Sequence, residues 1–172
     1  MAELKIVYYP DEPLTRKAAP VEEFGPELLR FANDMLETMD ANEGVGLAAP
    51  QVGVSRRMFV LCEPDGEPMC LVNPEIYEQE GREYGEEGCL SLPQVYAKVP
   101  RCTRIRVRAK DPLGNDLDFE ARDFLARIIQ HEYDHLEGVV FPDRLDVFSR
   151  EDAMLHWEEQ RRQLNENTVR RA

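Results

Sequence analysis

The sequence lacks any long apolar run: the best, MFVLC at residues 58–62, is far too short to span a membrane. Its first ten residues hold no basic cluster followed by an apolar stretch, so we expect no signal peptide and a cytoplasmic protein. Basic residues are in the minority, because 34 acidic against 21 basic residues give a formal net charge of −13. This charge argues against a broad nucleic-acid surface and against binding to anionic membranes. We therefore expect neither DNA nor a membrane among the partners.

Cysteine is scarce as well. The four cysteines among 172 residues are Cys62, Cys70, Cys89 and Cys102. They are too few for a disulfide scaffold, and in a reducing compartment a cysteine is more often a thiol, a ligand or a nucleophile. The sequence also lacks internal repeats and low-complexity segments. A chain of this length buries roughly 70% of its unfolded surface, so we expect one domain over residues 1–172.

Three helices are predicted from apolar residues that recur every three or four positions. They are expected at residues 26–39, 123–136 and 149–164. Pro26 suits a first helical turn, Gly138 suits the position after the second helix, and Ser149 suits an N-cap. Residues 4–20 are typical of an irregular arm, and residues 165–172 of a frayed tail.

Short strand-like runs separated by turns occupy the middle of the chain. The runs are residues 58–62, 70–72, 76–77 and 105–108. Asp65-Gly66 and Gly114-Asn115 are typical of hairpin turns. The order of helix, strands, helix and helix predicts an α+β fold. In it, mostly antiparallel short sheets surround a central helix at residues 123–136, with further helices near the N- and C-termini.

The central helix carries the strongest chemical signal. His131 and His135 are four residues apart, so both imidazoles lie on one face and reach a single metal ion. Glu132 lies about 100° further around the helix, where it can hold a water beside that metal. The two histidines and Glu132 continue apolar stripes, and unpaired polar groups on a buried face are costly. A solvated helix that matches this pattern by chance is the alternative. The third histidine, His156, is not expected to be a ligand.

Two histidines leave a catalytic metal one protein ligand short. The acids downstream are Glu137, Asp143, Asp146, Glu151, Asp152, Glu158 and Glu159, and none stands out. Cys89 is the better candidate, because it lies between Gly88 and Leu90 just before a turn that contains Pro93. Alone it is weak evidence, since a lone cysteine is most often a small buried apolar residue.

Three motifs occur in order: GVGLAAPQ at residues 44–51, EGCLS at residues 87–91 and QHEYDH at residues 130–135. Together they closely resemble the three signature motifs of bacterial-type peptide deformylase. The resemblance extends over residues 7–145. The short segment between the first two motifs is similar to the compact subclass that ends in a C-terminal helix.

The resemblance implies a site for one divalent metal ion. Its ligands would be Cys89, His131 and His135, with a water in the fourth position. The family resemblance favours Fe²⁺ as the native metal, with Zn²⁺ or Ni²⁺ in the purified protein. Nitrogen and sulfur ligands suit several metals, so the residues alone do not choose among them.

The resemblance also implies the reaction. The family removes the N-formyl group from the N-terminal methionine of new polypeptides, so N-formylmethionyl nascent peptides are the expected substrates. Hydroxide on the metal would attack the formyl carbon, with Glu132 as general base and then general acid. The Gln51 side chain and the backbone N–H of Leu90 would hold the developing oxyanion.

The substrate-binding residues follow from the same resemblance. The backbones of Val45, Gly46 and Gly88 would pair with the peptide. Arg127 lies one turn before His131, and we expect it, together with Ile128, to border the pocket for the methionine side chain. The alternative is an arginine whose stem covers the pocket rim while its charge stays in water.

Charged residues suggest two further features. Glu87 and Arg101 are predicted to form an ion pair behind the metal ligands. The basic residues near the C-terminus are candidates for a transient contact with the ribosome, and they are Arg161, Arg162, Arg170 and Arg171. An ordinary solvated helix end, with cations near its C-terminus, explains the same residues.

Three rival functions remain open on the sequence. A zinc endopeptidase would cleave internal peptide bonds and take a carboxylate or histidine as third ligand. A non-catalytic metal module would fill the fourth position with Cys62, Cys70 or Cys102, and Glu132 and Gln51 would then have no task. A hydrolase of the same fold acting on another formamide or amide is the third.

Overall fold

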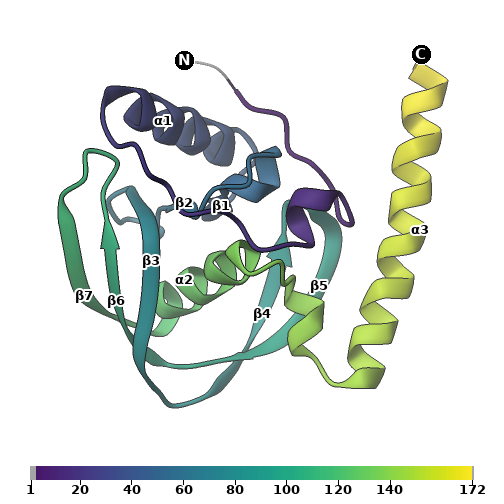
Figure 1. The fold of residues 1–172 in the computed structure, drawn as a ribbon. Helices are drawn as coiled ribbons and strands as arrows, with labels where there is room; N and C mark the ends of the chain where they lie inside the picture. The colour runs from purple at the N-terminus through teal and green to yellow at the C-terminus, as the bar shows by residue number, and fades with distance from the viewer. Residues whose placement is uncertain (1–2, 172) are drawn as a thin grey trace.

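The computed structural model describes residues 3–171, and the side chains of residues 3–167. Helix α2 (Asp123–Leu136) lies at the centre, with a five-stranded sheet on one side and a two-stranded hairpin on the other (Figure 1). Within the described part, no helix is both long and apolar enough to cross a membrane. The arrangement confirms the predicted α+β fold around a central helix.

Both sheets are antiparallel. The larger sheet has the order β1 (Gly46–Ala48), β2 (Met58–Leu61), β3 (Met69–Glu80), β6 (Arg104–Lys110) and β7 (Asp116–Arg122). The smaller one pairs β4 (Glu83–Cys89) with β5 (Leu92–Arg101). Strand β1 is therefore an edge strand, and it leads into a short 3₁₀ helix, Ala49–Val52, which completes the glycine-rich motif.

Strand boundaries depart from the prediction in the middle of the chain. The runs 70–72 and 76–77 belong to one 12-residue strand, β3, whose pairing with β6 shifts between Val72 and Glu75. Strands β1, β4, β5 and β7 were not predicted. For β7 the signal is present, because Leu117, Phe119 and Ala121 alternate with charged residues. The predicted turns at residues 65–66 and 114–115 do connect β2 to β3 and β6 to β7.

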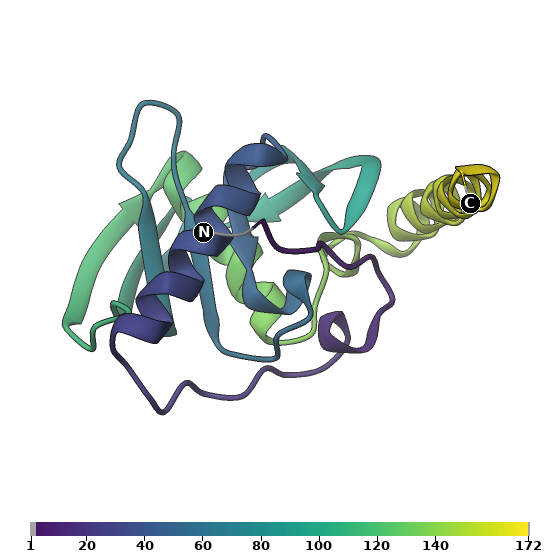
Figure 2. The same ribbon diagram turned by 90° about the horizontal axis from the view of Figure 1, so that it is seen from above.

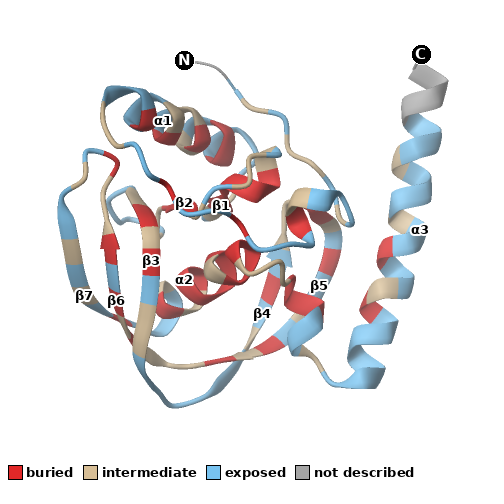
Figure 3. Ribbon diagram, in the orientation of Figure 1, coloured by how far each residue is buried: buried red, intermediate tan, exposed pale blue. Residues whose placement is uncertain are grey.

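The core that positions the site lies between the larger sheet and α2. Buried side chains of Phe59, Leu71 and Val107 in the sheet belong to the same cluster as Ala126 and Ile129 of α2. Figure 3 accordingly shows α2 as buried over most of its length after the first turn. Packing on this side fixes the helix, so that its His131–His135 face is held in one orientation.

Helix α1 (Pro26–Ala41) and α2 begin where the sequence predicts. Helix α1 covers the sheet near β1 and β2, with Leu28, Ala32 and Met35 buried. Helix α2 has the predicted bounds, and Gly138 follows it with a φ of +73°, the left-handed conformation that ends many helices.

The C-terminal helix requires two corrections. Helix α3 (Val147–Arg171) begins before Ser149, so Ser149 is not its N-cap. Asp146 has that role, because its Oδ1 accepts the backbone N–H of Ser149 at 2.9 Å. The helix also continues through residues 165–171, predicted as a frayed tail, since no glycine or proline interrupts residues 147–171. Residue 172 lies outside the described residues.

Helix α3 stands to one side of the body of the molecule (Figures 1 and 2). It is attached mainly through Ala153 and Trp157, which are buried against β5 and the 3₁₀ helix Phe141–Arg144. The indole of Trp157 donates to the carbonyl of Tyr9 at 3.1 Å. Most other described side chains of α3 are exposed (Figure 3).

Candidate metal centre

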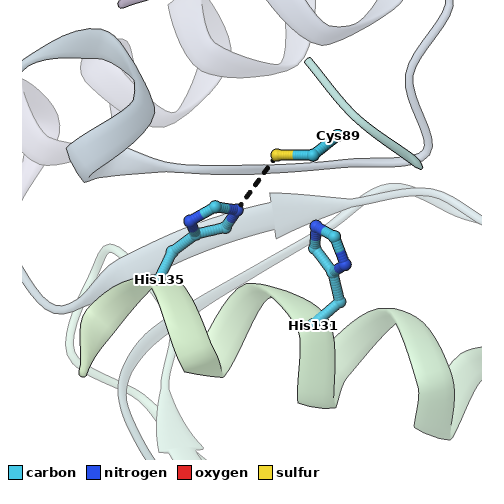
Figure 4. Close-up of side chains that lie close together, drawn as sticks. All are labelled: Cys89, His131 and His135. Carbon is cyan, nitrogen blue, oxygen red and sulfur yellow. Dashed lines mark hydrogen bonds between the residues drawn. The ribbon is translucent and has the colours of Figure 1, made fainter. Parts of the chain in front are cut away.

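Three predicted ligands come together between the hairpin and the central helix. Cys89 ends β4, and His131 and His135 occupy neighbouring turns of α2 (Figure 4). Their ligand atoms lie within 4.8 Å of one another, and the Cys89 Sγ is 3.4 Å from the His135 Nε2. A tetrahedral metal with typical bonds to sulfur and nitrogen separates such atoms by about 3.5 Å. The three side chains therefore fit one metal ion.

The ligand set is a triad. Among the described residues, no fourth His, Cys, Asp or Glu joins the cluster, and Cys62, Cys70 and Cys102 lie outside it. Catalytic sites characteristically keep one position of the metal free of protein ligands, whereas structural sites close all four. His156 is also elsewhere, on α3, where its Nε2 lies 2.8 Å from the carbonyl of Gln94.

Glu132 is buried beside the triad, with only 4% of its surface exposed. Its Oε1 has no hydrogen-bond partner among the described residues. Burial raises the pKa of Glu132 to about 7, although the nearby His131 charge acts to lower it. A carboxyl with a pKa near neutrality can both accept and donate a proton. The unpaired oxygen beside the triad matches a place for a water molecule next to a metal.

The imidazole of His131 is held from behind by Glu87. The Nδ1 of His131 lies 2.8 Å from the Glu87 Oε1. Burial acts to raise the pKa of Glu87, but hydrogen bonds with His131 and Arg101 lower it to about 2. Glu87 is therefore ionised and can only accept, so Nδ1 carries a hydrogen and Nε2 is left for the metal.

The predicted ion pair between Glu87 and Arg101 is present and bidentate. The Nε and Nη2 of Arg101 donate to the two carboxylate oxygens of Glu87, both at 2.9 Å. The Nη1 of Arg101 also donates to Asp134 at 2.6 Å, and Arg144 donates to Asp134 at 2.7 and 3.0 Å. Sequence reasoning missed Asp134 and Arg144. A buried acid next to His135 was a usable signal, because such an acid needs a cationic partner.

The two histidines differ in their protonation. Burial, together with the charges of His131 and Arg101, lowers the pKa of His135 well below its usual range. At His131 burial acts in the same direction, but the Glu132 charge and the contacts with Cys89 and Glu87 raise the pKa well above its usual value. A metal ion at His131 would therefore displace a proton.

Gln51 points at the triad from the 3₁₀ helix after β1. Its Oε1 accepts the backbone N–H of Ala48 at 2.9 Å, and its Nε2 lies 3.4 Å from the Cys89 Sγ. The same Nε2 is 3.3 Å from the Oγ of Ser91, a contact that the sequence did not suggest. These contacts fix the amide so that its N–H group faces the metal centre.

A cavity of about 490 Å³ opens beside the triad. Every residue predicted to bind substrate lines it, namely Val45, Gly46, Gly88, Arg127 and Ile128, together with Gln51, Leu90 and Glu132. Cys89 and His131 form part of the cavity wall, whereas His135 is buried and does not line the cavity. The structure thus brings the predicted residues together around one hollow.

Arg127 lines this cavity and also ties the hairpin to α2. Its Nη1 donates to Glu87 at 2.6 Å and to the carbonyl of Val99 at 2.8 Å, and its Nη2 donates to the carbonyl of Glu83 at 2.8 Å. The side chain is 13% exposed. Arg127 is thus a bound cross-link and not the solvated rim residue of the alternative interpretation.

The fold and site define the class as an α+β protein whose Cys–His–His triad could hold a metal ion and faces a cavity beside a buried acid. The family model described as "Polypeptide deformylase" matches residues 3–151. The chain belongs to the peptide deformylase family, whose members are metal-dependent hydrolases.

Similar proteins cover nearly the whole chain. The peptide deformylase of Chromohalobacter salexigens is 46% identical over 170 residues, which are 96% of this chain and 99% of that protein. The crystal structure of the Legionella pneumophila peptide deformylase has a TM-score of 0.89 and 40% identity, and covers 95% of this chain and 98% of that one. The Ehrlichia chaffeensis enzyme in complex with actinonin has a TM-score of 0.88 and 38% identity, with 93% and 98% covered.

Proposed function

We propose that this enzyme removes the N-formyl group from the N-terminal methionine of newly made polypeptides. Family membership supports the reaction class. The observation that carries the proposal is the buried Glu132, whose Oε1 has no partner among the described residues, beside a three-ligand site that opens to a cavity. A closed structural site would give neither the carboxylate nor the cavity a role.

The proposed cofactor is one divalent metal ion per chain, held by Cys89, His131 and His135. We propose Fe²⁺ as the native metal, with Zn²⁺ or Ni²⁺ in the purified protein. When bound, the metal supplies Lewis acidity, which makes a water nucleophilic near neutral pH. Glu87 orients His131 for this task, since an outer carboxylate fixes the tautomer and direction of a ligating ring.

Glu132 is the proposed proton carrier. It would take the proton of the attacking water and deliver it to the amine nitrogen as the formyl C–N bond breaks. A pKa of about 7 suits both directions of transfer. General acid–base catalysis of this kind contributes about 10²–10⁴-fold to the rate.

The formyl oxygen becomes negatively charged during the attack, and two donors are proposed to receive it. One is the Nε2 of Gln51, which is aimed at the centre by its bond to Ala48. The other is the backbone N–H of Leu90, next to Cys89 at the end of β4. Donors of this type are each worth about 10²–10³-fold in acyl-transfer enzymes.

The peptide is proposed to bind as an added strand. Strand β1 is the edge of the larger sheet, so the outer side of the backbone at Val45 and Gly46 is available for pairing, with Gly88 of β4 across the cavity, whereas the Val45 carbonyl already accepts the N–H of Cys62 at 2.9 Å. The methionine side chain would enter the part of the cavity lined by Arg127 and Ile128. Action in the cytoplasm, and a transient contact of Arg161, Arg162, Arg170 and Arg171 with the ribosome, remain predictions, and the side chains of Arg170 and Arg171 lie outside the described ones.

Product analysis tests the proposal against the endopeptidase alternative. The metal-loaded enzyme is incubated with one N-formylmethionyl peptide and with the same peptide unformylated, and the products are identified by mass spectrometry. We expect loss of the formyl group from the first peptide with every peptide bond intact, and no change in the second. Cleavage of internal bonds in either peptide would overturn the proposal, and so would deformylation of simple formamides at the same efficiency.

A further inference from the structure

A second cavity, of about 430 Å³, lies on the side of α2 that faces away from the metal centre. Gln130, Tyr133 and Asp134 contribute to it from α2. At about 100° per residue, Gln130 and Tyr133 lie opposite the face that carries His131 and Glu132, and Asp134 lies at the edge between the two faces. No residue of this second cavity lines the first one, so it is a separate hollow.

The second cavity is rich in positive charge. Arg82, Arg101 and Arg144 line it, against a single acid, Asp134. Even when the nearby Glu87 is counted with Asp134, the cluster keeps an excess positive charge, in a chain whose formal net charge is −13. A concentration of arginines on a strongly acidic protein calls for a specific reason.

Two of these arginines are available to a ligand. Arg144 is held by Asp134 through its Nε and Nη2, and the side chain is 49% exposed. No hydrogen bond from its Nη1 is found among the described residues, so this group is left for a second acceptor. Arg82 is exposed and stacks over the ring of Tyr84, with its Cζ 5.3 Å from the ring centroid. The Nη2 of Arg82 also donates to the hydroxyl of Tyr84 at 2.9 Å, so the remaining N–H groups of this exposed guanidinium are the ones left for a second acceptor.

Arg101 forms the inner wall of the second cavity, and its N–H groups are already engaged in ion pairs. It is 4% exposed at its side chain and bridges Glu87 and Asp134. It therefore contributes a fixed positive charge at the base of the cavity and not a flexible arm. A buried cation below two exposed guanidinium groups is a suitable environment for an anion with several acceptor oxygens.

We propose that this second cavity binds one small oxyanion of the sulfate, phosphate or carboxylate class, held by Arg82 and Arg144 above Arg101. A free small anion is favoured over a nucleic acid, because the overall charge of −13 repels a long polyanion, whereas a single ion meets only the local excess. Arg101 also holds Glu87 behind the metal ligands, but no residue of the second cavity lines the metal cavity, so anion binding can be measured separately from the proposed reaction.

The test is titration calorimetry of the full-length, metal-loaded protein with sodium sulfate at constant ionic strength. Sulfate is the probe because it is a poor ligand for divalent metals. We expect one binding site per chain. Arg82→Gln should weaken binding by about tenfold or more, the loss that follows when a charge-assisted hydrogen bond is removed. Arg144→Gln should do the same.

The matched control is Arg108→Gln. Arg108 also stacks on a tyrosine, with its Cζ 4.6 Å from the Tyr77 ring centroid, but it lies outside the second cavity. This variant should bind sulfate like the parent. Thermal unfolding of all variants without sulfate separates lost binding from lost folding, and Arg82→Gln should be as stable as the parent because Arg82 is exposed.

Three results would overturn the proposal. The first is no sulfate binding by the parent at concentrations into the millimolar range. The second is sulfate binding that Arg82→Gln and Arg144→Gln leave unchanged. The third is binding of a short RNA, but not of sulfate, that is lost in the same variants, which would assign the arginines to nucleic acid.

Discussion

Gly46 lies directly against Glu132, and the closeness of the two residues explains why a glycine stands there. A Cβ built on residue 46 would come within 2.5 Å of the Glu132 Oε2 and 2.9 Å of its Cδ. Any side chain at residue 46 must therefore displace the carboxylate that we propose as the proton carrier. The glycine-rich motif thus shapes the site as well as the peptide-binding edge.

Gly46→Ala is accordingly expected to damage catalysis without removing the metal. The added methyl group pushes Glu132 away from its place, so kcat should fall by about 10²-fold or more, within the range of lost general acid–base catalysis. The metal content should stay at the parent level, because the methyl group contacts Glu132 and none of the three ligands. Steady-state kinetics and elemental analysis of the same preparation measure both quantities. A variant with the kcat of the parent would contradict the assigned role of this contact.

Arg127 is expected to stabilise the fold through the hairpin. It donates to the carbonyls of Glu83 and Val99 and to Glu87, so Arg127→Met leaves several acceptors unpaired near the cavity. Each unsatisfied buried group costs about 1–3 kcal/mol, and we expect the free energy of unfolding to fall by about 2–4 kcal/mol. Urea denaturation measures this loss.

The same residue tests the proposed methionine pocket. Gly85 leaves room for the guanidinium, because a Cβ there would be 2.8 Å from the Arg127 Cζ. Replacing Arg127 by Leu should therefore change the shape of the cavity and the preference for the first side chain of the peptide. An unchanged preference would assign Arg127 to the hairpin alone.

Arg101 is expected to control metal affinity although it touches no ligand. Arg101→Met leaves Glu87 and Asp134 without their shared cation, and His131 loses its firmly held acceptor. Loss of contacts that hold a metal-ligating side chain in place typically weakens metal binding by about 10–100-fold. Competition with a chromogenic chelator gives the metal dissociation constant. Arg108→Met is a suitable control, and equal constants for the parent and Arg101→Met would refute this role.

Cys70 is expected to resist alkylation in the folded protein. Burial raises the pKa of its thiol to about 12, and the Asp111 charge adds to the effect. Because the thiolate is the reactive form, a raised pKa keeps Cys70 protonated and slow at pH values near 8. Peptide mapping after iodoacetamide treatment should find Cys70 modified much faster in urea than in buffer. Equal rates in the two conditions would contradict the burial of the Cys70 thiol.

Part of the fold was predictable because local signals agree. Helix α2 combines a three- to four-residue apolar period with Gly138 after its end, and its bounds were predicted fully. Strands β4 and β5 were not, because they are charged and rich in glycine and proline, and tertiary contacts hold them. Arg127 of α2 holds this hairpin over 28 to 44 positions of sequence.

The residues of the candidate site were likewise only partly predictable from the sequence. The spacing of His131 and His135 is local, and Cys89 was recognised from its motif. Asp134 and Ser91 were missed because their roles depend on partners 33 and 40 residues away, Arg101 and Gln51. The start of α3 was misplaced because both Asp146 and Ser149 are good N-cap residues, and only the structure shows which one accepts.

The most direct test of the central claim is formate release from a short N-formylmethionyl peptide. The protein is purified without oxygen and loaded with Fe²⁺, and Glu132→Gln, matched in metal content, is assayed beside it. We predict turnover by the parent and a loss of about 10²-fold or more in the variant. A folded, metal-loaded parent that releases no formate would contradict the account, and a variant as active as the parent would contradict the role of Glu132.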